Sequence, residues 1–211
     1  MDQYQDYNTL QNVHHEGTDY VILMRKADAR LVVMAPHGGG IEPGTVDIAD
    51  AIAGGDFTFY AFKGLMKSGN RVLHIGSSRF DEPVGLSVAG EAQIVVTIHG
   101  CRGKIPEILI GGSHAALKDT LRQSLSLAGF RARISEQPGL RGMDPANICN
   151  RFTHRGGVQL ELSRGQREAM FNHLENRSFR GKTTVFFDFV QAVRRPLREQ
   201  LDKWRAQNKR E

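Results

Sequence analysis

The sequence predicts a single α/β domain with a mixed, mostly buried central sheet flanked by helices. With 211 residues, the chain is long enough for one domain with a full hydrophobic core and short for two. Its apolar content of 40% and charged content of 24% are typical of globular proteins. Short apolar segments alternate with helical patterns, an order typical of α/β layer folds. We therefore assign residues 1–211 to one domain, with its core over 18–190 and a basic C-terminal helix over 191–211.

Eight apolar segments have the length and β-branched content of strands. They are YVILM (20–24), RLVVMAP (30–36), FTFYAF (57–62), RVLHI (71–75), AQIVVTIHG (92–100), EILIGG (107–112), RARIS (131–135) and GVQLELS (157–163). Several of these segments are apolar almost throughout, which is typical of strands covered on both faces. Together they predict a largely buried sheet of mixed strand direction.

Periodic segments between and after the strands predict helices. Residues 45–54 and 113–129 each begin with Ser or Thr and end with Gly, as helices with N-caps and C-caps commonly do. Apolar residues recur at intervals of three and four from Phe186 to Trp204, which predicts an amphipathic helix docked on the domain. Pro196 interrupts this pattern and predicts a kink or the start of a new helix.

The net charge of +5 is concentrated at the C-terminal end. Residues 191–211 carry seven Lys or Arg against three Asp or Glu, which leaves +1 for the other 190 residues. A near-neutral body without an RNA- or DNA-reading motif argues against nucleic acid as a partner. The sequence has no run of about 20 apolar residues and no signal-peptide pattern. We therefore expect no membrane partner and a cytoplasmic protein, released only if the cell lyses.

The two cysteines, Cys101 and Cys149, are too few for a disulfide framework and lack the short spacing of a zinc knuckle. We therefore expect both to be free thiols.

A histidine stands at the end of each of two predicted strands. His37 follows the apolar run LVVMAP, and His99 follows QIVVTI. Because ligands of open α/β sheets bind outside the carboxyl ends of the strands, we expect both imidazoles in one cleft. Three glycines, Gly38 to Gly40, permit a loop that folds the carboxylate of Glu42 back beside His37. Two histidines and a glutamate with an open fourth position form the ligand set of a hydrolytic zinc site.

Two other interpretations of these residues stay open. A histidine after a strand is often a capping residue or a hydrogen-bonded core residue. The run HGGG also occurs as the oxyanion loop of lipases and esterases. That second interpretation requires a G-x-S-x-G nucleophile elbow, and the sequence contains none.

Five motifs extend the pattern over most of the chain. In chain order they are APHGGGIEPGT, SSRFDEP, TIHGCRG, GMDPANICNR and GVQLELSRGQR. Together they resemble the phage-type poly-γ-glutamate hydrolases, a family similar to a compact branch of the zinc carboxypeptidase fold. The resemblance implies that His37, Glu42 and His99 hold Zn²⁺. It also implies that Glu161, in QLELS, is the catalytic general base, whereas the ordinary alternative for Glu161 is a solvent-facing strand residue.

The implied substrate carries one free α-carboxylate per residue, so a cleft for it needs fixed cations. Arginine suits this role because its planar guanidinium pairs with a carboxylate through two hydrogen bonds. Candidates are Arg102, Arg151 and Arg164, each of which has a surface residue as its ordinary alternative. Asn150 with Arg151 also resembles the Asn-Arg pair that grips the terminal carboxylate in zinc carboxypeptidases. Glu82 is a further candidate for the substrate cleft, with a helix N-cap as its alternative.

These observations together lead us to expect a zinc-dependent hydrolase that cleaves γ-glutamyl amide bonds in the polyanion poly-γ-glutamate. One alternative is a carboxypeptidase- or acylase-like amidohydrolase of small peptides or N-acyl amino acids, in which Arg151 would bind a chain end. Another is a non-enzymatic phage or prophage protein that binds ligand or builds structure. Loss of a ligand or of the base would mark that last class, yet His37, Glu42, His99 and Glu161 are all present. The sequence leaves the oligomeric state open, together with endo or exo cleavage and the preference for D- or L-glutamate.

Overall fold

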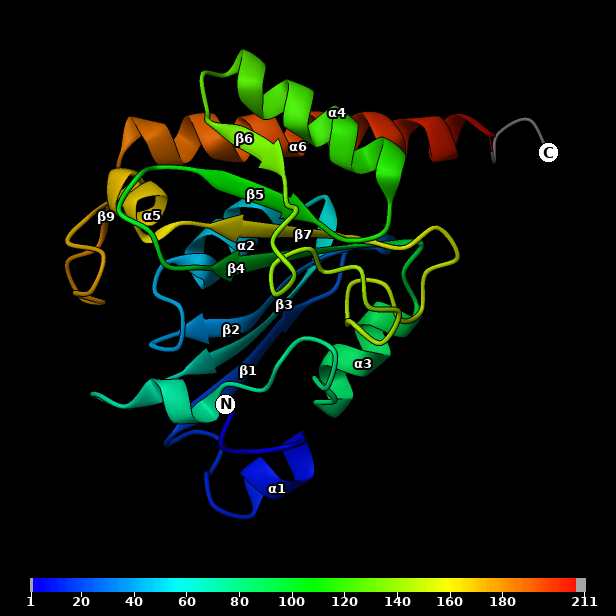
Figure 1. Cartoon of the computed structure of the whole chain (residues 1–211). Helices are drawn as coiled ribbons and strands as arrows, with labels where there is room; N and C mark the ends of the chain where they lie inside the picture. Colours follow the sequence, from blue (N-terminus) through cyan, green and yellow to red (C-terminus); the bar gives the residue numbers. More distant parts are fainter. Residues whose placement is uncertain (1, 208–211) are drawn as a thin grey trace.

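A computed structural model describes residues 2–207, which fold around one seven-stranded sheet (Figure 1). Its strands are, in chain order, β1 (Tyr20–Arg25), β2 (Asp28–Gly39), β3 (Phe57–Gly64), β4 (Ile94–Gly100), β5 (Ile108–Gly111), β6 (Ala132–Ile134) and β7 (Val158–Leu162). Their order in space is β1-β3-β2-β4-β7-β5-β6. The four central strands β3, β2, β4 and β7 are parallel, whereas β1 and β5 run antiparallel to β3 and β7. The predicted mixed sheet is thus confirmed, and the carboxyl ends of β2, β4 and β7 meet at one edge (Figure 1).

Helices cover both faces of this sheet. The helical segments are α1 (Tyr7–Gln11), α2 (Thr45–Ala53), the 3₁₀-helix η1 (Asn70–Leu73), α3 (Pro83–Gly90), α4 (Ala115–Leu127), α5 (Arg164–Met170) and α6 (Thr184–Gln207). The long helix α6 packs against α2, α4 and α5 on one face, and α1 and α3 lie on the opposite side (Figure 1). A short two-stranded sheet of β8 (Phe171–Asn172) and β9 (Gly181–Lys182) lies apart from the main one. None of the helices in residues 2–207 is long and apolar enough to cross a lipid bilayer.

Alternating residues of the central strands supply two hydrophobic cores. In β2, Leu31, Val33 and Ala35 pack into the first core, which contains residues of α2, α4 and α6. Val32 and Met34 point the other way into the second core, which contains residues of α1 and α3. This alternation follows from the period of two along a strand. Burial on both faces explains why the strands read as nearly continuous apolar runs.

A β-bulge near the end of β2 reverses this alternation. From Ala35 to Gly38, β2 advances by three residues while its partner β3 advances by two. The extra residue moves every following side chain to the opposite face. His37 would otherwise lie on the first-core side with Ala35. Instead its ring lies 6.2 Å, centroid to centroid, from Phe80 of the second core.

The strand predicted for RVLHI (71–75) is wrong, because this segment overlaps the 3₁₀-helix η1 and pairs with no strand among residues 2–207. Leu73 and Ile75 are nevertheless buried in the second core. The apolar pattern of this segment therefore results from its packing against the second core and not from strand pairing. Gly69, which precedes the turn, has a φ of +75°, a backbone conformation that favours glycine.

The predicted boundaries at the chain ends also need correction. The predicted core began at residue 18, but Tyr4 and Leu10 are already buried in the second core. The helix predicted over 191–211 begins at Thr184 and is described as far as Gln207, while residues 208–211 lie outside the described part. Pro196 lies inside this one helix, so no new helix begins there. Burial of apolar side chains on both sides of the proline offsets the missing backbone hydrogen bond.

The helix caps differ slightly from the prediction. The N-cap of α2 is Gly44, one residue before the expected Thr45. The N-cap of α4 is His114, one residue after the expected Ser113. Both cysteines are free, as predicted.

Candidate active site

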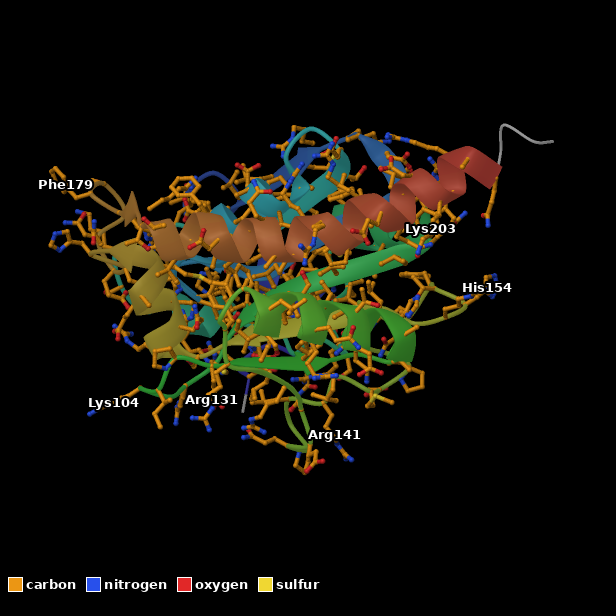
Figure 2. The ribbon with its side chains drawn as sticks, turned by 90° about the horizontal axis from the view of Figure 1, so that it is seen from above. Lys104, Arg131, Arg141, His154, Phe179 and Lys203 are labelled. Carbon is orange, nitrogen blue, oxygen red and sulfur yellow. The ribbon has the colours of Figure 1, made fainter. Side chains whose placement is uncertain are left out.

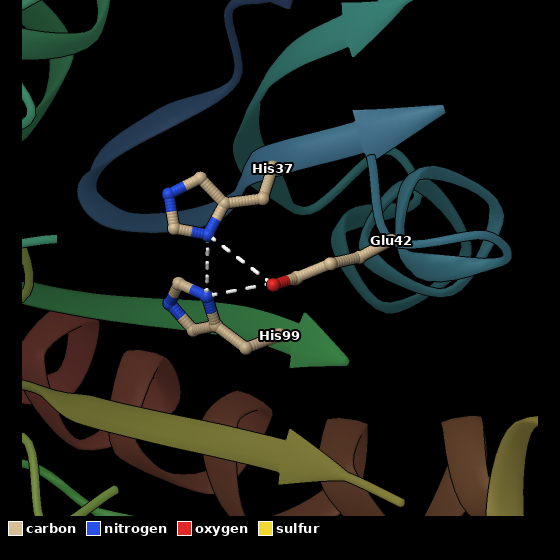
Figure 3. A group of neighbouring side chains, drawn as sticks. All are labelled: His37, Glu42 and His99. Carbon is tan, nitrogen blue, oxygen red and sulfur yellow. Dashed lines mark hydrogen bonds and ion pairs between the residues drawn. The ribbon is translucent and has the colours of Figure 1, made fainter. Parts of the chain in front are cut away.

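The structure brings His37, Glu42 and His99 together at the carboxyl ends of β2 and β4 (Figure 3). The Nδ1 atoms of the two histidines lie 3.2 Å apart. Oε1 of Glu42 lies 3.5 Å from Nδ1 of His37, and its Oε2 lies 3.8 Å from Nδ1 of His99. All three side chains are buried, and one donor atom from each lies within 4.8 Å of the other two, so the three residues form a compact triangle.

The size of the triangle fits a divalent metal ion. Tetrahedral zinc holds nitrogen and oxygen ligands at about 2.0–2.2 Å, which places neighbouring ligands about 3.3–3.6 Å from one another. The separations of 3.2 Å between the two Nδ1 atoms and 3.5 Å between Nδ1 of His37 and Oε1 of Glu42 are close to that range, and Oε2 of Glu42 lies 3.8 Å from Nδ1 of His99. Two imidazoles and a carboxylate also match the donor set that zinc prefers in hydrolytic sites. The residues present therefore fit a zinc ion.

Hydrogen bonds orient two of these three side chains. Nε2 of His37 donates to the carbonyl oxygen of Ile75 at 2.6 Å, so the neutral ring presents an unprotonated Nδ1 to the triangle. One oxygen of Glu42 accepts from the backbone N–H of Gly100 at 2.8 Å. Nε2 of His99 is buried without a hydrogen-bond partner among residues 2–207. No hydrogen bond at Nε2 therefore selects the tautomer of His99.

The electrostatics of the triangle favour ionised Glu42 and neutral His99. Burial raises the pKa of Glu42, but His37, His99 and the Gly100 N–H outweigh it and hold this pKa at about 2. Burial, with His37 next in effect, lowers the pKa of His99 to about 3. A carboxylate and a neutral imidazole are the protonation states in which these side chains bind metal ions.

The glycine run allows the loop after β2 to pack closely against neighbouring segments. Gly39 has a φ of +67°, and a Cβ there would collide with the carbonyl oxygen of Gly64 at the end of β3. A Cβ on Gly38 would collide with the side chain of Val46 in α2. The chain therefore turns tightly between the sheet and α2, and this turn returns the carboxylate of Glu42 to His37.

Glu161 lies on β7 directly beside His99, its register partner on β4. Cross-strand neighbours point to the same face of a sheet, and both residues line the same cleft. Burial, followed by the negative charge of Glu42, raises the pKa of Glu161 to about 8 in the metal-free protein. A cation in the triangle would favour the ionised form of Glu161. Glu161 is thus a buried carboxyl group beside the triangle of His37, Glu42 and His99.

The triangle and Glu161 open into a cleft of about 810 Å³. Three exposed arginines line this cleft: Arg71, Arg102 and Arg141. Among residues 2–207, their side chains make no ion pair and no hydrogen bond. Figure 2 shows Arg141 on the loop after β6, where its side chain extends outward. The cleft therefore offers free cations to an anionic ligand.

Three other residues predicted for substrate binding do not line this cleft. The guanidinium of Arg151 donates to the carbonyl oxygens of Ala146 and Ser78, and that of Arg164 pairs with Glu168 and Glu175. Glu82 is buried as the N-cap of α3. Its carboxylate also accepts a hydrogen bond from the Tyr60 hydroxyl at 2.6 Å. Glu82 is thus a helix N-cap, which was the alternative to a role in the substrate cleft. Of the three predicted arginines, only Arg102 lines the cleft.

Sequence reasoning missed several residues at this edge of the sheet. Arg71 and Arg141 gave no signal, because each stands in a segment whose position depends on distant contacts. His74 is a third such residue. Its Nδ1 lies 2.7 Å from Asp2, and its ring lines the cleft with its centroid 4.0 Å from that of His37.

Arg167 on α5 is the other missed residue. Its buried guanidinium donates to the carbonyl oxygens of Pro43, Cys101 and Leu162, at 2.9, 3.1 and 3.3 Å. Pro43 and Leu162 directly follow Glu42 and Glu161 in the sequence, and Cys101 lies two residues after His99. Arg167 thus joins the three chain segments that carry the site.

Comparisons with known proteins agree with this architecture. The family model described as poly-gamma-glutamate hydrolase matches residues 4–192. Among curated proteins, YndL of Bacillus subtilis (strain 168) is 32% identical over 201 residues, covering 93% of this chain and 78% of YndL. The SPbeta prophage-derived protein YoqZ of the same organism is 32% identical over 202 residues, covering 95% of this chain and 73% of YoqZ.

Two solved structures are similar over nearly their whole length. A bacteriophage poly-gamma-glutamate hydrolase superposes with a TM-score of 0.89 at 30% identity, covering 96% of this chain and 99% of the other. A structure of YndL described as its zinc-free apo form superposes with a TM-score of 0.88 at 32% identity, covering 95% and 99%. Because the family model matches most of the chain and the relatives are about as similar in sequence as in fold, the chain belongs to the poly-γ-glutamate hydrolase family.

Proposed function

We propose that this protein is a zinc-dependent hydrolase that cleaves γ-glutamyl amide bonds in poly-γ-glutamate. One observation carries the proposal: a buried triangle of His37, Glu42 and His99 has the spacing of zinc ligands and lies beside the carboxyl group of Glu161. Family membership supports the substrate. The zinc-free description of one YndL structure supports the choice of metal.

The cleft arginines support a polyanionic substrate. Arg71, Arg102 and Arg141 have no anionic partner among residues 2–207 and face the cleft that contains the triangle. Poly-γ-glutamate presents a free α-carboxylate on every residue, and guanidinium groups bind carboxylates through paired hydrogen bonds. We therefore assign these arginines to the carboxylates that flank the cleaved bond.

In this mechanism, His37, Glu42 and His99 would hold the zinc ion. When bound, zinc supplies polarisation of the scissile carbonyl and increases the acidity of a water molecule. Glu161 accepts a proton from the attacking water and delivers it to the amide nitrogen as the C–N bond breaks. The products are a new carboxyl group and a free amine, so every atom of the water is accounted for. The buried position of Glu161 keeps bulk water from competing for that proton.

The structure weakens the small-peptide alternative. That alternative used Asn150 and Arg151 as a clamp for a chain end. Asn150 instead accepts hydrogen bonds from Ser113 and Gly157, and its amide nitrogen donates to two loop carbonyls. Arg151 is likewise bound to backbone carbonyls. Both side chains thus stabilise the loop that borders the cleft.

Metal content and polymer cleavage test the proposal together. We expect about one zinc per purified chain and shortening of poly-γ-glutamate, measured by size-exclusion chromatography. Shortening should stop with a chelator and return with added zinc. Glu161→Gln should retain zinc and nearly abolish turnover, whereas Glu91→Gln makes the same change at an exposed site and serves as control.

The zinc mechanism, the general base and the substrate can each be refuted separately. Polymer shortening that survives complete removal of metal would refute the zinc mechanism. Substantial turnover by Glu161→Gln would remove Glu161 from the role of base. Stoichiometric zinc without polymer shortening would refute the substrate and direct attention to small γ-glutamyl or acyl amides.

A further inference from the structure

A chain of hydrogen bonds leads from the backbone at Cys149 to the carboxyl group of Glu161. The backbone N–H of Cys149 donates to Oδ1 of Asn147 at 3.1 Å. Nδ2 of Asn147 donates to Oε1 of Gln159 at 2.9 Å, and Nε2 of Gln159 donates to Oε1 of Glu161 at 2.8 Å. Four groups are thus joined in series, and the last one is the proposed base.

The backbone N–H of Cys149 sets the donor-to-acceptor direction of this series of hydrogen bonds. A backbone N–H can only donate, so the side-chain oxygen of Asn147 must face Cys149. The amide nitrogen of Asn147 then faces Gln159, which must present its oxygen to that nitrogen. The remaining group of Gln159, its NH₂, therefore points at Glu161. One fixed donor thus determines the orientation of two amides that could otherwise turn over by 180°.

Burial holds the side chains of this hydrogen-bond series in place. Asn147, Gln159 and Glu161 are only 4, 3 and 6% exposed, although all three border the cleft. Gln159 and Glu161 are two residues apart on β7 and therefore point to the same face. A Cβ on Gly142 would lie 2.9 Å from Oε1 of Gln159, so the loop backbone also packs closely against this amide. Gln159 therefore has little room to adopt another position.

The bond from Gln159 is the only hydrogen bond that the Glu161 side chain makes with residues 2–207. It engages Oε1 alone and leaves the other carboxyl oxygen, Oε2, without a protein partner. A carboxylate held at one oxygen by a neutral donor keeps its orientation and retains a free oxygen that can accept a proton.

We propose that Gln159 is a positioning residue that holds Glu161 for proton transfer, and that Asn147 acts through it by fixing the orientation of the Gln159 amide. This inference rests on the proposed function, in which Glu161 is the base. It extends that function to two residues whose hydrogen bonds do not reach the triangle.

Gln159→Met tests the first step, because methionine has nearly the same length but no N–H donor. We expect kcat on poly-γ-glutamate to fall at least tenfold, since small errors in the position of a catalytic group are costly. KM and zinc content should change less than about twofold. A crystal structure of the zinc-bound variant should show the Glu161 carboxylate displaced or in several orientations. Gln93→Met, an exposed change of the same kind, is the matched control.

A double-mutant cycle tests the serial order. Asn147→Leu removes the donor to Gln159, so kcat should fall, by less than in Gln159→Met. In the Gln159→Met background, Asn147→Leu should change kcat by less than about twofold, because the link it breaks is already lost. Two reductions that multiply fully in the double variant would overturn the role of Asn147.

The outcomes also separate this inference from the proposed function. Suppose that Glu161→Gln is inactive, while Gln159→Met keeps the parental kcat and an undisturbed Glu161 carboxylate. That result would overturn the role of Gln159 alone. An active Glu161→Gln protein would overturn the base, and with it the reason for positioning it.

Discussion

Substituting Arg167 by methionine tests whether one buried cation holds the site together. The side chain is 5% exposed and donates three hydrogen bonds to carbonyl oxygens at 2.9, 3.1 and 3.3 Å. These carbonyls belong to three segments far apart in the sequence. Methionine fills most of the same volume but offers no donor. The substitution therefore removes the connection without leaving a large cavity.

The size of the effect follows from these contacts. Hydrogen bonds from charged donors contribute about 1.5–3 kcal/mol each, so three independent bonds would contribute about 5–9 kcal/mol. Burial of the guanidinium opposes this sum, and the same burial lowers the pKa of Arg167. Because the partners are neutral carbonyls, methionine leaves acceptors without this donor, at about 1–3 kcal/mol each, rather than an unpaired charge. We therefore expect the free energy of unfolding of the metal-free protein to fall by about 3–5 kcal/mol.

Urea unfolding in the presence of chelator measures this change, and a competition titration measures zinc affinity. Because Arg167 supports the segments that carry the ligands, affinity should fall about 10- to 100-fold. Arg164→Met is the control, since that exposed arginine pairs only with surface carboxylates and should cost less than about 1 kcal/mol. A loss below 1 kcal/mol with unchanged zinc affinity would refute the structural role of Arg167.

Four further predictions follow from the site. His99→Ala should lose zinc and turnover together, as elemental analysis and the polymer assay will show; a metal-replete variant would exclude His99 as a ligand. Arg141→Ala should raise KM for poly-γ-glutamate far more than for an uncharged γ-glutamyl amide, whereas equal changes in steady-state kinetics would contradict its contact with carboxylates. Arg151→Ala should lower the melting temperature by several degrees, measured by calorimetry, because its bonds to backbone carbonyls are lost; a selective rise in KM would instead restore the chain-end clamp. The raised pKa of Glu161, about 8 against 4.5 for a free side chain, stabilises the fold at low pH and loses that effect as pH rises through 8. Urea unfolding of the metal-free protein should therefore show the parent losing stability relative to Glu161→Gln between about pH 4.5 and 8, and parallel curves would contradict the shift.

The candidate ligands were accessible from sequence because each carries a local signal. His37 and His99 end apolar strands, and parallel strands bring their carboxyl ends to one edge whatever the rest of the chain does. The glycine run marks a tight turn that returns Glu42 to the sheet. Gln159 also had a signal, since alternation along VQLEL places it on the same face as Glu161. Its role was missed because a hydrogen-bond partner such as Asn147 cannot be found from strand periodicity.

Two of the three arginines predicted to bind substrate are held by groups of the protein itself. Arg151 and Arg164 look like Arg102 in sequence, each standing near a motif residue. Arg151 is held by backbone carbonyls and Arg164 by two exposed glutamates, while Arg102 remains free in the cleft. The residue type alone does not specify whether the partner of an arginine is a protein group or a ligand.

The α/β class, the burial of the sheet and the residue types of the site follow from the sequence, because periodicity, glycine placement and donor chemistry are local properties. Tertiary structure alone decided which face His37 occupies. Strict alternation along β2 places it opposite His99, and the bulge against β3 reverses that placement. Tertiary contacts likewise decide that Asn70–Leu73 forms a helical turn and that Arg71 and Arg141 reach the cleft. These outcomes depend on pairing and packing between segments far apart in the chain, and such contacts form only when the whole domain folds.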